Sequence, residues 1–499
     1  MFYLKKIITA NQAKETDRYT LKKEFVSSLE LMERASLAFV TAIANTLDSA
    51  QKIVVVCGIG NNGGDGLAIA RILRSRGYIV EAILLKTGNT LSPDCLVNFN
   101  KLTEVSVLAP EDPLPNFKYY DLLIDAIFGS GLTREIKGFP ATVIEKINSD
   151  KIKVLSVDIP SGLYFDQLPD SKAIVNSDLT ISFQRPKLAF FFQESHPYIK
   201  QWKVVDIGLD ENFIQALPTN EFVLDKRISK RVKTRNKHAH KGTLGHSLLI
   251  AGSYGKIGAA VLASKACLRA GAGLLTTYIP NCGYQILQTA VPEAICLTDK
   301  KKKYLSRVPN ISPYAAIGIG PGIGKNSATK EFLAALFSAT KVPLVIDADA
   351  LNLIAEHREL LKTLPKNAIL TPHPKEFERL VGKWNTTIEC FQKQKQFAKK
   401  HQCIVLLKGA NTCICNPEGM LFFNTSGNPG MATGGSGDVL TGIITGLLAQ
   451  GYSCIEASLI GVYFHGQAGD KAAREKGENA LISSDIIKYL KIENSSISY

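Results

Sequence analysis

Short apolar segments alternate with amphipathic helical segments along the whole chain, and this alternation constrains the fold more than any other feature. In the first half, the expected strands cover residues 53–57, 79–85, 122–128, 154–159, 179–183 and 204–207. Helical periodicity lies between several of them, as at 67–74 and 141–147. An apolar strand followed by an amphipathic helix is the repeating unit of a parallel, doubly wound sheet. We therefore expect an α/β fold.

The pattern restarts in the second half. Strands are expected at 247–251, 274–279, 315–319, 344–347, 368–371 and 403–407, with a hairpin of 412–415 and 420–423. Helices are expected over 259–269, from 438 onward, over 455–472 and over 484–490. Residues 217–241 are polar, basic and weakly patterned, so we predict a linker there. The predicted domains are 1–216 and 222–499, with 217–241 as the basic linker and the start of the second domain.

The composition is that of a globular protein without a membrane span. The chain has 499 residues, of which 45% are hydrophobic and 21% charged. No apolar run approaches the roughly 18 residues that a bilayer span requires. Residues 1–14 lack the long apolar core of a signal peptide, and the ten cysteines contain no C-x-x-C pair, which favours buried reduced thiols. We expect a cytoplasmic location.

The net charge of +14 raises the question of nucleic-acid binding. Eight basic residues fall between Lys226 and Lys241 without an acid among them, and Lys300–Lys303 form a second basic run. Neither run is interleaved with the aromatic residues of a base-stacking surface. Solvated surface is the favoured interpretation, attraction of phosphorylated small molecules comes second, and no nucleic acid is expected as a partner.

A glycine-rich segment follows the first expected strand. Gly58, Gly60 and Gly63 satisfy the G-x-G-x-x-G pattern, which is by itself a weak sign of a dinucleotide site. Two asparagines and an aspartate within the segment are unusual for a loop that only holds pyrophosphate. The sequence at this point leaves both a dinucleotide loop and a different chemical site open.

Further polar residues stand at the ends of later strands. Asp125 and Asp158 each end an apolar run, and the carboxyl ends of parallel strands meet in one crevice. Oxygen atoms of Asn62, Asp125 and Ser161 could hold a hard cation there, and Asp158 could transfer protons. Each residue taken alone is as readily a turn former or a helix cap; their combination favours a site.

Three strings in this half, GIGNNGGDGLAIAR, DAIFGSGLTR and DIPSGL, resemble the NAD(P)H-hydrate epimerase domain, whose fold is a Rossmann-like doubly wound sheet. LMERAS is similar to the family's preceding helix, with Ser36 where glycine is more usual. The resemblance covers about residues 5–215. It implies a potassium site at Asn62, Asp125 and Ser161. The substrate contacts that it implies are Asn61, Asn62, Gly63, Gly64, Asp65, Gly129, Ser130, Gly131, Leu132, Thr133, Arg134, Glu135 and Asp158.

The run from Gly427 to Asp438 is the strongest chemical signal in the second half. Its glycines precede an apolar helical segment, so backbone N–H groups and a helix N-terminus can converge on an anion such as phosphate. A carboxylate in such a cradle suits removal of a proton from a hydroxyl group that attacks a phosphoryl group. The segment 320–326 only approximates a P-loop, because its spacing is one residue short and Asn326 replaces Ser or Thr.

This half resembles the ADP- or ATP-dependent NAD(P)H-hydrate dehydratases, which have a ribokinase-like α/β fold. The matching strings are HKGTLGHSLLIAGS, GIGPGIG, IDADALN, LTPHPKEF, LLKGANT and GNPGMATGGSGDVLTG, within residues 222–495. The resemblance implies that magnesium accompanies ADP, with Glu376 helping to place it. It places the hydrated nicotinamide nucleotide at Ala259, Gly322, His373 and Asp438. It places the adenine nucleotide at Lys408, Gly409, Ala410, Asn411, Thr412 and Gly437.

The hypothesis from the sequence is a bifunctional repair enzyme for the hydrates NADHX and NADPHX, expected to be a homo-oligomer. Asp158 and potassium would serve the epimerase. Asp438 would serve a dehydratase that uses ADP and releases AMP and phosphate. One alternative is a ribokinase-like kinase of a vitamin or other small molecule, fused to a Rossmann-like nucleotide-binding module. A second is a non-catalytic RNA-associated module, which could have lost Asp125, Asp158 and Asp438.

Overall fold

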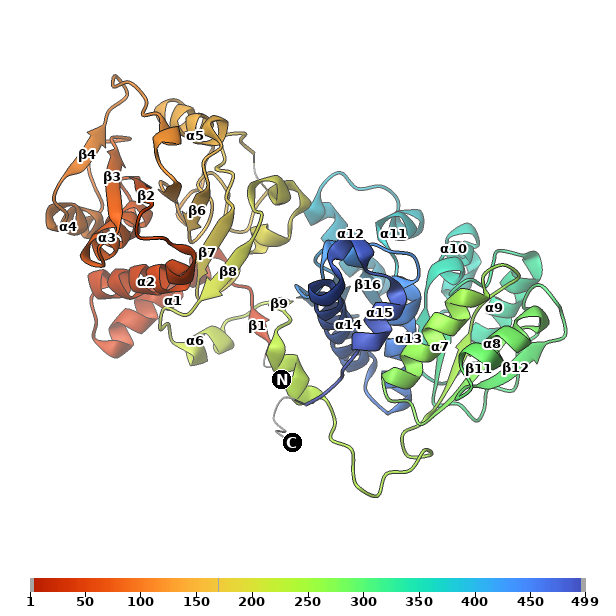
Figure 1. The fold of residues 1–499 in the computed structure, drawn as a ribbon. Helices are drawn as coiled ribbons and strands as arrows, with labels where there is room; N and C mark the ends of the chain where they lie inside the picture. The colour runs from red at the N-terminus through yellow and green to blue at the C-terminus, as the bar shows by residue number, and fades with distance from the viewer. Residues whose placement is uncertain (1–3, 169, 495–499) are drawn as a thin grey trace. The chain divides into compact units, whose positions relative to one another are not determined.

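The computed structural model describes residues 4–168 and 170–494 (Figure 1). Residues Lys6–Thr219, together with Thr386–Ile388, form the first compact unit, and the rest of the described chain forms the second. Among the helices of these residues, none combines the length and the apolar character needed to cross a membrane.

The sheet of the first unit has seven parallel strands in the order β4-β3-β2-β5-β6-β7-β8. This confirms the predicted doubly wound, Rossmann-like sheet. Strands β5 and β6 each end two residues earlier than predicted, at Ala126 and Val157. Asp158 and the residues that follow it therefore lie in a loop. The short edge strand β4 was not predicted, because two of its four residues are exposed and it lacks a continuous apolar run. The strands are β2 (Lys52–Cys57), β3 (Ile79–Leu85), β4 (Val105–Leu108), β5 (Leu122–Ala126), β6 (Val154–Val157), β7 (Leu179–Phe183) and β8 (Trp202–Val205).

Helices cover both faces of this sheet (Figure 1). Apolar residues of α2 and α3, such as Phe39 and Leu67, pack on one face, and those of α5, such as Ile144, pack on the other. Each face thus buries one side of nearly continuous apolar strands. The helices are α1 (Ala10–Glu24), α2 (Ser28–Ile43), α3 (Asn61–Ser75), α4 (Pro93–Lys101), α5 (Phe139–Asp150) and α6 (Glu211–Ala216).

Helix α3 begins at Asn61, six residues before the expected start at 67. The glycine-rich segment is therefore mostly the first turn of a helix. Its glycines are needed for close packing: a Cβ atom on Gly63 would lie 1.7 Å from the carbonyl oxygen of Gly58. The G-x-G-x-x-G pattern here brings a helix close to the end of β2. A dinucleotide site would need an acid about 20 residues beyond these glycines to bind the ribose; Glu81, which lies near that distance, instead accepts a hydrogen bond from Tyr120.

We predict that Gly63→Ala lowers the free energy of unfolding of the first unit by about 1–3 kcal/mol or more, because the methyl group forces α3 away from β2. Gly60→Ala is the matched control, since a Cβ atom there would meet no atom within 4 Å. Urea unfolding can be followed by the fluorescence of Trp202 in a Trp384→Phe background, because the chain has 2 tryptophans. Equal stability of the two glycine variants would contradict this packing.

The sheet of the second unit is mixed and has eleven strands, in the order β1-β9-β18-β17-β16-β15-β14-β13-β10-β11-β12. Antiparallel pairs join β16 to β17 and β17 to β18, which confirms the expected hairpin. The strands from β10 to β16 pair in parallel. The strands are β1 (Lys5–Lys6), β9 (Glu221–Val223), β10 (His246–Ile250), β11 (Leu274–Pro280), β12 (Ile295–Asp299), β13 (Ala316–Ile319), β14 (Leu344–Ile346), β15 (Ile369–Leu370), β16 (Ile404–Leu407), β17 (Cys413–Cys415) and β18 (Leu421–Phe423).

The largest core of this unit lies where α13 and α14 pack on the sheet, around Ile443, Ile444 and Ile460. Helix α13 also packs closely against α7. This is the ribokinase-like α/β architecture expected for the second half. The helices are α7 (Ile257–Arg269), α8 (Tyr284–Ala290), α9 (Ser327–Ala339), α10 (Ala348–Glu356), α11 (Pro374–Val381), α12 (Thr387–His401), α13 (Ser436–Ala449), α14 (Cys454–Lys476) and α15 (Ser483–Tyr489).

The segment 217–241 contains ordered structure. It includes β9 and a 3₁₀ helix over Lys226–Arg231, and Leu224, Ile228 and Val232 are buried in the core of the second unit. These three apolar residues are spaced four apart, a pattern typical of one buried helical face. The many charged residues around them led to the prediction of a linker instead. Several of the basic side chains are also engaged, as where Arg231 lies 3.2 Å from the Glu456 carboxylate.

Candidate functional sites

A cavity of about 830 Å³ lies at the carboxyl ends of the strands in the first unit. The start of α3, the loop after β5 and the residues after β6 line it, as expected for a parallel sheet. Of the expected substrate contacts, Gly63 and Gly64 are buried in packing, and Glu135 pairs with Lys137 at 2.7 Å. The others line the cavity: Asn61, Asn62, Asp65, Gly129, Ser130, Gly131, Leu132, Thr133, Arg134 and Asp158.

Asn62, Asp125 and Ser161 meet beneath this cavity. The backbone N–H of Ser161 donates to Asp125 Oδ2 at 2.9 Å, and its hydroxyl group donates to Oδ1. Burial raises the pKa of Asp125, while hydrogen bonds from Ser161, Ser156 and Ile127 oppose that rise. Asn62 donates to the Val157 carbonyl at 3.0 Å, and its buried Oδ1 has no hydrogen-bond partner in the described part of the chain. A buried amide oxygen without a partner and a buried carboxylate are of the ligand types that a hard cation takes.

Asp158 is held in an uncommon backbone conformation, with φ 66°. Its Oδ1 accepts a hydrogen bond from the Phe183 N–H at 2.8 Å and lies 2.7 Å from the Lys187 ammonium group. Both Asp158 and Lys187 are buried residues. Such strain persists where the surroundings fix it, and it is common at active sites. The sequence analysis missed Lys187; its only signal is a lysine directly before the apolar run of residues 188–192.

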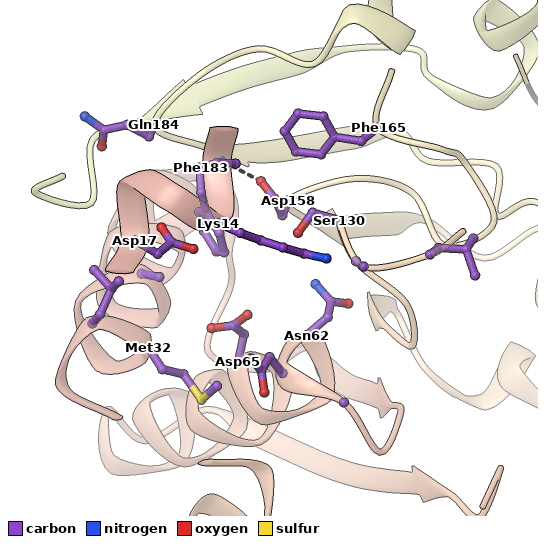
Figure 2. A pocket seen from close by; sticks show the side chains of 18 of the residues that line it. Lys14, Asp17, Met32, Asn62, Asp65, Ser130, Asp158, Phe165, Phe183 and Gln184 are labelled. Carbon is purple, nitrogen blue, oxygen red and sulfur yellow. Dashed lines mark hydrogen bonds between the residues drawn. The ribbon is translucent and has the colours of Figure 1, made fainter. Parts of the chain in front are cut away.

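Helix α1 also contributes to the cavity, which the sequence analysis did not predict. Lys14, Asp17 and Arg18 line it, and Figure 2 shows the Lys14 side chain extending into the space near Asn62 and Ser130. These residues recur three and four positions apart, and so share one face of the helix. In the sequence alone, three charged residues at this spacing are typical of a helix face exposed to solvent, so they did not point to a cavity.

In the second unit, Asp438 is the third residue of α13 and borders a cavity of about 410 Å³. Ala259 and Gly322 line the same cavity, so three of the four residues expected to contact the hydrated nucleotide come together. Burial, together with the charges of Asp347 and Asp349 and against the opposing charge of Lys408, raises the pKa of Asp438 to about 6. The cavity is lined by Gly255, Lys256, Gly258, Ala259, Gly322, Ala348, Asp349 and Asp438.

A buried polar network supports Asp438. Asp347 accepts hydrogen bonds from the Lys408 ammonium group at 2.8 Å and from the Thr441 hydroxyl at 2.8 Å. Burial alone would lower the pKa of Lys408, but the carboxylates of Asp347 and Glu376 raise it on balance. A Cβ atom on Gly437 would lie 3.2 Å from Lys408 Nζ, so glycine leaves the ammonium group accessible from α13. The network thus places a fixed cation beside the N-terminus of α13.

His373, the fourth residue expected to contact the hydrated nucleotide, caps α11 and does not line the cavity. Its Nδ1 accepts a hydrogen bond from the Glu376 N–H at 3.3 Å, and the Glu376 carboxylate accepts one from the His373 N–H at 2.8 Å. Burial lowers the pKa of His373, which favours a neutral ring. The capping role uses one oxygen of Glu376, which the resemblance associates with magnesium.

The expected adenine-nucleotide residues form the turn after β16. Lys408 ends in the polar network, and the Thr412 hydroxyl donates to the Gly409 carbonyl at 3.2 Å. Ala410 and Asn411 lie within this turn. Of the turn residues, Lys408 is the one whose side chain comes close to Gly437. His465, expected to be a core histidine, is indeed buried, and burial lowers its pKa to about 4.

Two α/β units, each with an acidic group beside a cavity at its strand ends, define a two-domain enzyme of the nucleotide-binding type. Residues 247–491 match the family model described as NAD(P)H-hydrate dehydratase, and residues 28–189 match the model of the YjeF-related protein N-terminus. Bifunctional NAD(P)H-hydrate repair enzyme Nnr of Moorella thermoacetica is 35% identical to this chain, and the match covers 97% of this chain and 96% of that one.

Two further proteins are similar to parts or most of this chain. The Escherichia coli protein of the same name is 31% identical over 93% of this chain and 88% of its own. The crystal structure of ADP/ATP-dependent NAD(P)H-hydrate dehydratase from Bacillus subtilis, co-crystallised with ATP and Mg²⁺, is 30% identical, covers 53% of this chain and 94% of its own, and has a TM-score of 0.47. The chain belongs to the family of bifunctional NAD(P)H-hydrate repair enzymes.

Proposed function

We propose that Asp158 and Asp438 are the residues that perform the two reactions of this bifunctional enzyme. The activities of the family are epimerisation of the R and S hydrates of NADH and NADPH and nucleotide-dependent dehydration. The observation that carries the assignment of residues is the position of each carboxylate. Each lines a cavity; Asp158 is paired with the buried Lys187, and the charge of Lys408, which is bonded to Asp347, acts on Asp438.

In the dehydratase unit, Asp438 accepts the proton of the ring hydroxyl group, and the hydroxyl oxygen attacks the terminal phosphoryl group of ADP. AMP leaves, and a phosphate ester remains on the ring. The lone pair of the ring nitrogen then expels phosphate and forms a C=N⁺ bond, and loss of a proton from the adjacent ring carbon to solvent restores the double bond of NADH or NADPH. Lys408 and the N–H groups at the start of α13 stabilise the charge on the phosphoryl group. Magnesium would accompany the nucleotide and neutralise part of its charge.

ADP, rather than ATP, is the proposed phosphoryl donor, because the two-domain fusion is of the bacterial type. Incubation of the purified S hydrate with each nucleotide, followed by analysis of the products, tests this proposal. Release of NADH with AMP and phosphate supports it. A stable phosphorylated product would instead indicate the small-molecule kinase.

The cytoplasmic location and the homo-oligomer remain predictions, and gel filtration tests the oligomeric state.

In the epimerase unit, Asp158 moves protons to and from the substrate. Potassium, if bound by Asn62, Asp125 and Ser161, would supply a fixed positive charge close to Asp125. The orphaned Asn62 oxygen and the buried Asp125 carboxylate support this site.

We predict that potassium raises the melting temperature of the first unit at constant ionic strength, compared with tetramethylammonium, because binding to the folded state stabilises it. Asn62→Ala should abolish this difference by removing one ligand. Asn148→Ala is a control on α5, since Asn148 lies away from the cavity and donates to the Ile174 carbonyl. A potassium-dependent shift that persists in Asn62→Ala would place the ion elsewhere.

A further inference from the structure

We propose that Asp17 on helix α1 is a second acid–base group of the epimerase cavity and acts on the face of the nicotinamide ring opposite Asp158. This inference rests on the proposed role of Asp158. Helix α1 precedes residues 28–189, which the family model of the N-terminal unit matches. Asp17 also lies outside every motif that the sequence analysis identified.

Contacts at both ends of α1 fix the position of Asp17. At the start of the helix, the Ala10 N–H donates to the Asp166 carboxylate at 3.2 Å. Towards its end, the rings of Tyr19 and Phe213 stack with centroids 4.2 Å apart. Two contacts further along the first unit thus hold the helix against the cavity. A side chain in the middle of such a helix is more precisely placed than one on a loop.

Asp17 lines the cavity together with Asp158 and Asp65, and Figure 2 shows the three carboxylates around the same space. Among the described residues, the Asp17 carboxylate forms no hydrogen bond or ion pair. The buried Lys187 ammonium group pairs with Asp158 instead, at 2.7 Å. Asp158 and Asp17 therefore have different surroundings. Asp158 is bonded to a cation, whereas Asp17 is available to a ligand.

The surroundings of Asp17 favour its protonated form. Burial, together with the charge of Asp158 and against the opposing charge of Lys187, raises the pKa of Asp17 to about 6. Asp17 can thus carry a proton near pH 6 while Asp158 stays paired with a cation. Different environments assign acid and base roles to paired carboxyl groups in this way. The other charged residues that line the cavity are Lys14, Arg18, Asp65, Asp94, Arg134 and Arg185.

The reaction needs groups on two faces, because the R and S hydrates carry the hydroxyl group on opposite faces of the same ring carbon. In one direction, the Asp17 carboxyl group donates its proton to the hydroxyl group, and water leaves with the electrons of the C–O bond. The ring nitrogen lone pair forms a C=N⁺ bond. A solvent water then adds from the other face, its proton passes to Asp158, and the C=N⁺ electrons return to nitrogen. In the reverse direction the two carboxyl groups exchange roles.

The test compares Asp17→Asn with the wild-type chain, using a purified single epimer. Epimerisation should fall about 10²- to 10⁴-fold, the usual contribution of a general acid or base. Asp17→Glu should restore part of the rate. Glu15→Gln is the matched control, because Glu15 is exposed on the same helix and does not line the cavity. Dehydration of the S hydrate by the same samples should stay unchanged, and urea unfolding followed by Trp202 fluorescence shows whether the first unit is folded.

The pH profile adds a readout that a merely structural role would not change. The wild-type rate should fall as the pH rises above about 6, because Asp17 loses the proton that it donates, and Asp17→Asn should lose this alkaline decline. Product formed in H₂¹⁸O should contain one solvent oxygen for each epimerisation, and its absence would contradict the route.

An epimerisation rate of Asp17→Asn within about twofold of wild type would overturn the inference. In that case Asp158→Asn shows which claim has failed. If Asp158→Asn is inactive, only the role of Asp17 is wrong. If both variants are active, the assignment of the cavity itself is wrong.

Discussion

Asp438→Asn is expected to abolish dehydration of the S hydrate, with a loss of about 10²- to 10⁴-fold, while epimerisation by the same chain continues. Asparagine keeps the shape of the side chain but cannot accept the proton of the ring hydroxyl group. The hydroxyl oxygen then remains a poor nucleophile toward ADP. The measurement is the initial rate of NADH formation from purified S hydrate, ADP and magnesium, followed by absorbance.

Asp485→Asn is the matched control for this variant. Asp485 is the third residue of α15, as Asp438 is of α13, but it lies away from the cavity. The control should dehydrate at the wild-type rate, so that any loss in Asp438→Asn reflects the chemistry and not the change of charge near a helix N-terminus. Dehydration retained in Asp438→Asn would contradict the proposed base.

The same role fixes the pH dependence of dehydration. Burial raises the pKa of Asp438 to about 6. A base must be ionised, so kcat/KM should fall about tenfold for each pH unit below 6 and level off above it. Because the hydrates also interconvert without enzyme, each rate is corrected with an enzyme-free sample. A profile that stays level down to pH 5 would contradict Asp438 as the base.

Asp158→Asn is expected to remove epimerisation to a similar extent and to leave dehydration of the S hydrate intact. The variant also leaves the Lys187 ammonium group buried beside a neutral amide, which is costly in itself. The double variant Asp158→Asn/Lys187→Met removes both charges and should be more stable than the single variant, but equally unable to epimerise. The measurement is conversion of purified R hydrate to S, resolved by chromatography.

Recovery of epimerisation in the double variant would contradict the role of Asp158. It would mean that the single variant failed because of an unpaired lysine and not because a proton acceptor was lost. The two variants together therefore separate chemistry from stability at a buried ion pair.

The sequence predicted the central strands well, because buried parallel strands are continuous apolar runs bounded by glycine and polar residues. It failed at the edges of both sheets. Strand β4 has two adjacent exposed residues, and strand β12 has exposed residues at alternating positions, so both lack that signal. It also placed the start of α3 six residues late, since the five glycines among residues 58–66 resemble a loop. Their role in close packing depends on atoms of β2 and on the residues after β5.

The site was predicted where the motif itself supplies the residue. Asn62, Asp125, Ser161 and Asp158 stand at strand ends or the helix start of the first unit, which its backbone topology brings to one edge of the sheet, and Asp438 stands at a helix start of the second unit. Lys187 and Asp17 could not be found in this way. One lies in an apolar segment and the other on a helix that looks solvated, and only the tertiary fold brings both to the cavity.

The most direct test of the central claim, that one chain performs both reactions, starts from a mixture of the R and S hydrates of NADH. The wild-type protein is added with potassium, magnesium and ADP, and the return of NADH absorbance is followed. Both units acting together predict complete recovery, because the epimerase supplies the S form as the dehydratase consumes it. If recovery stops near the initial fraction of S hydrate and continues only at the rate of spontaneous epimerisation, the epimerase assignment is contradicted. No recovery with either ADP or ATP would contradict the dehydratase.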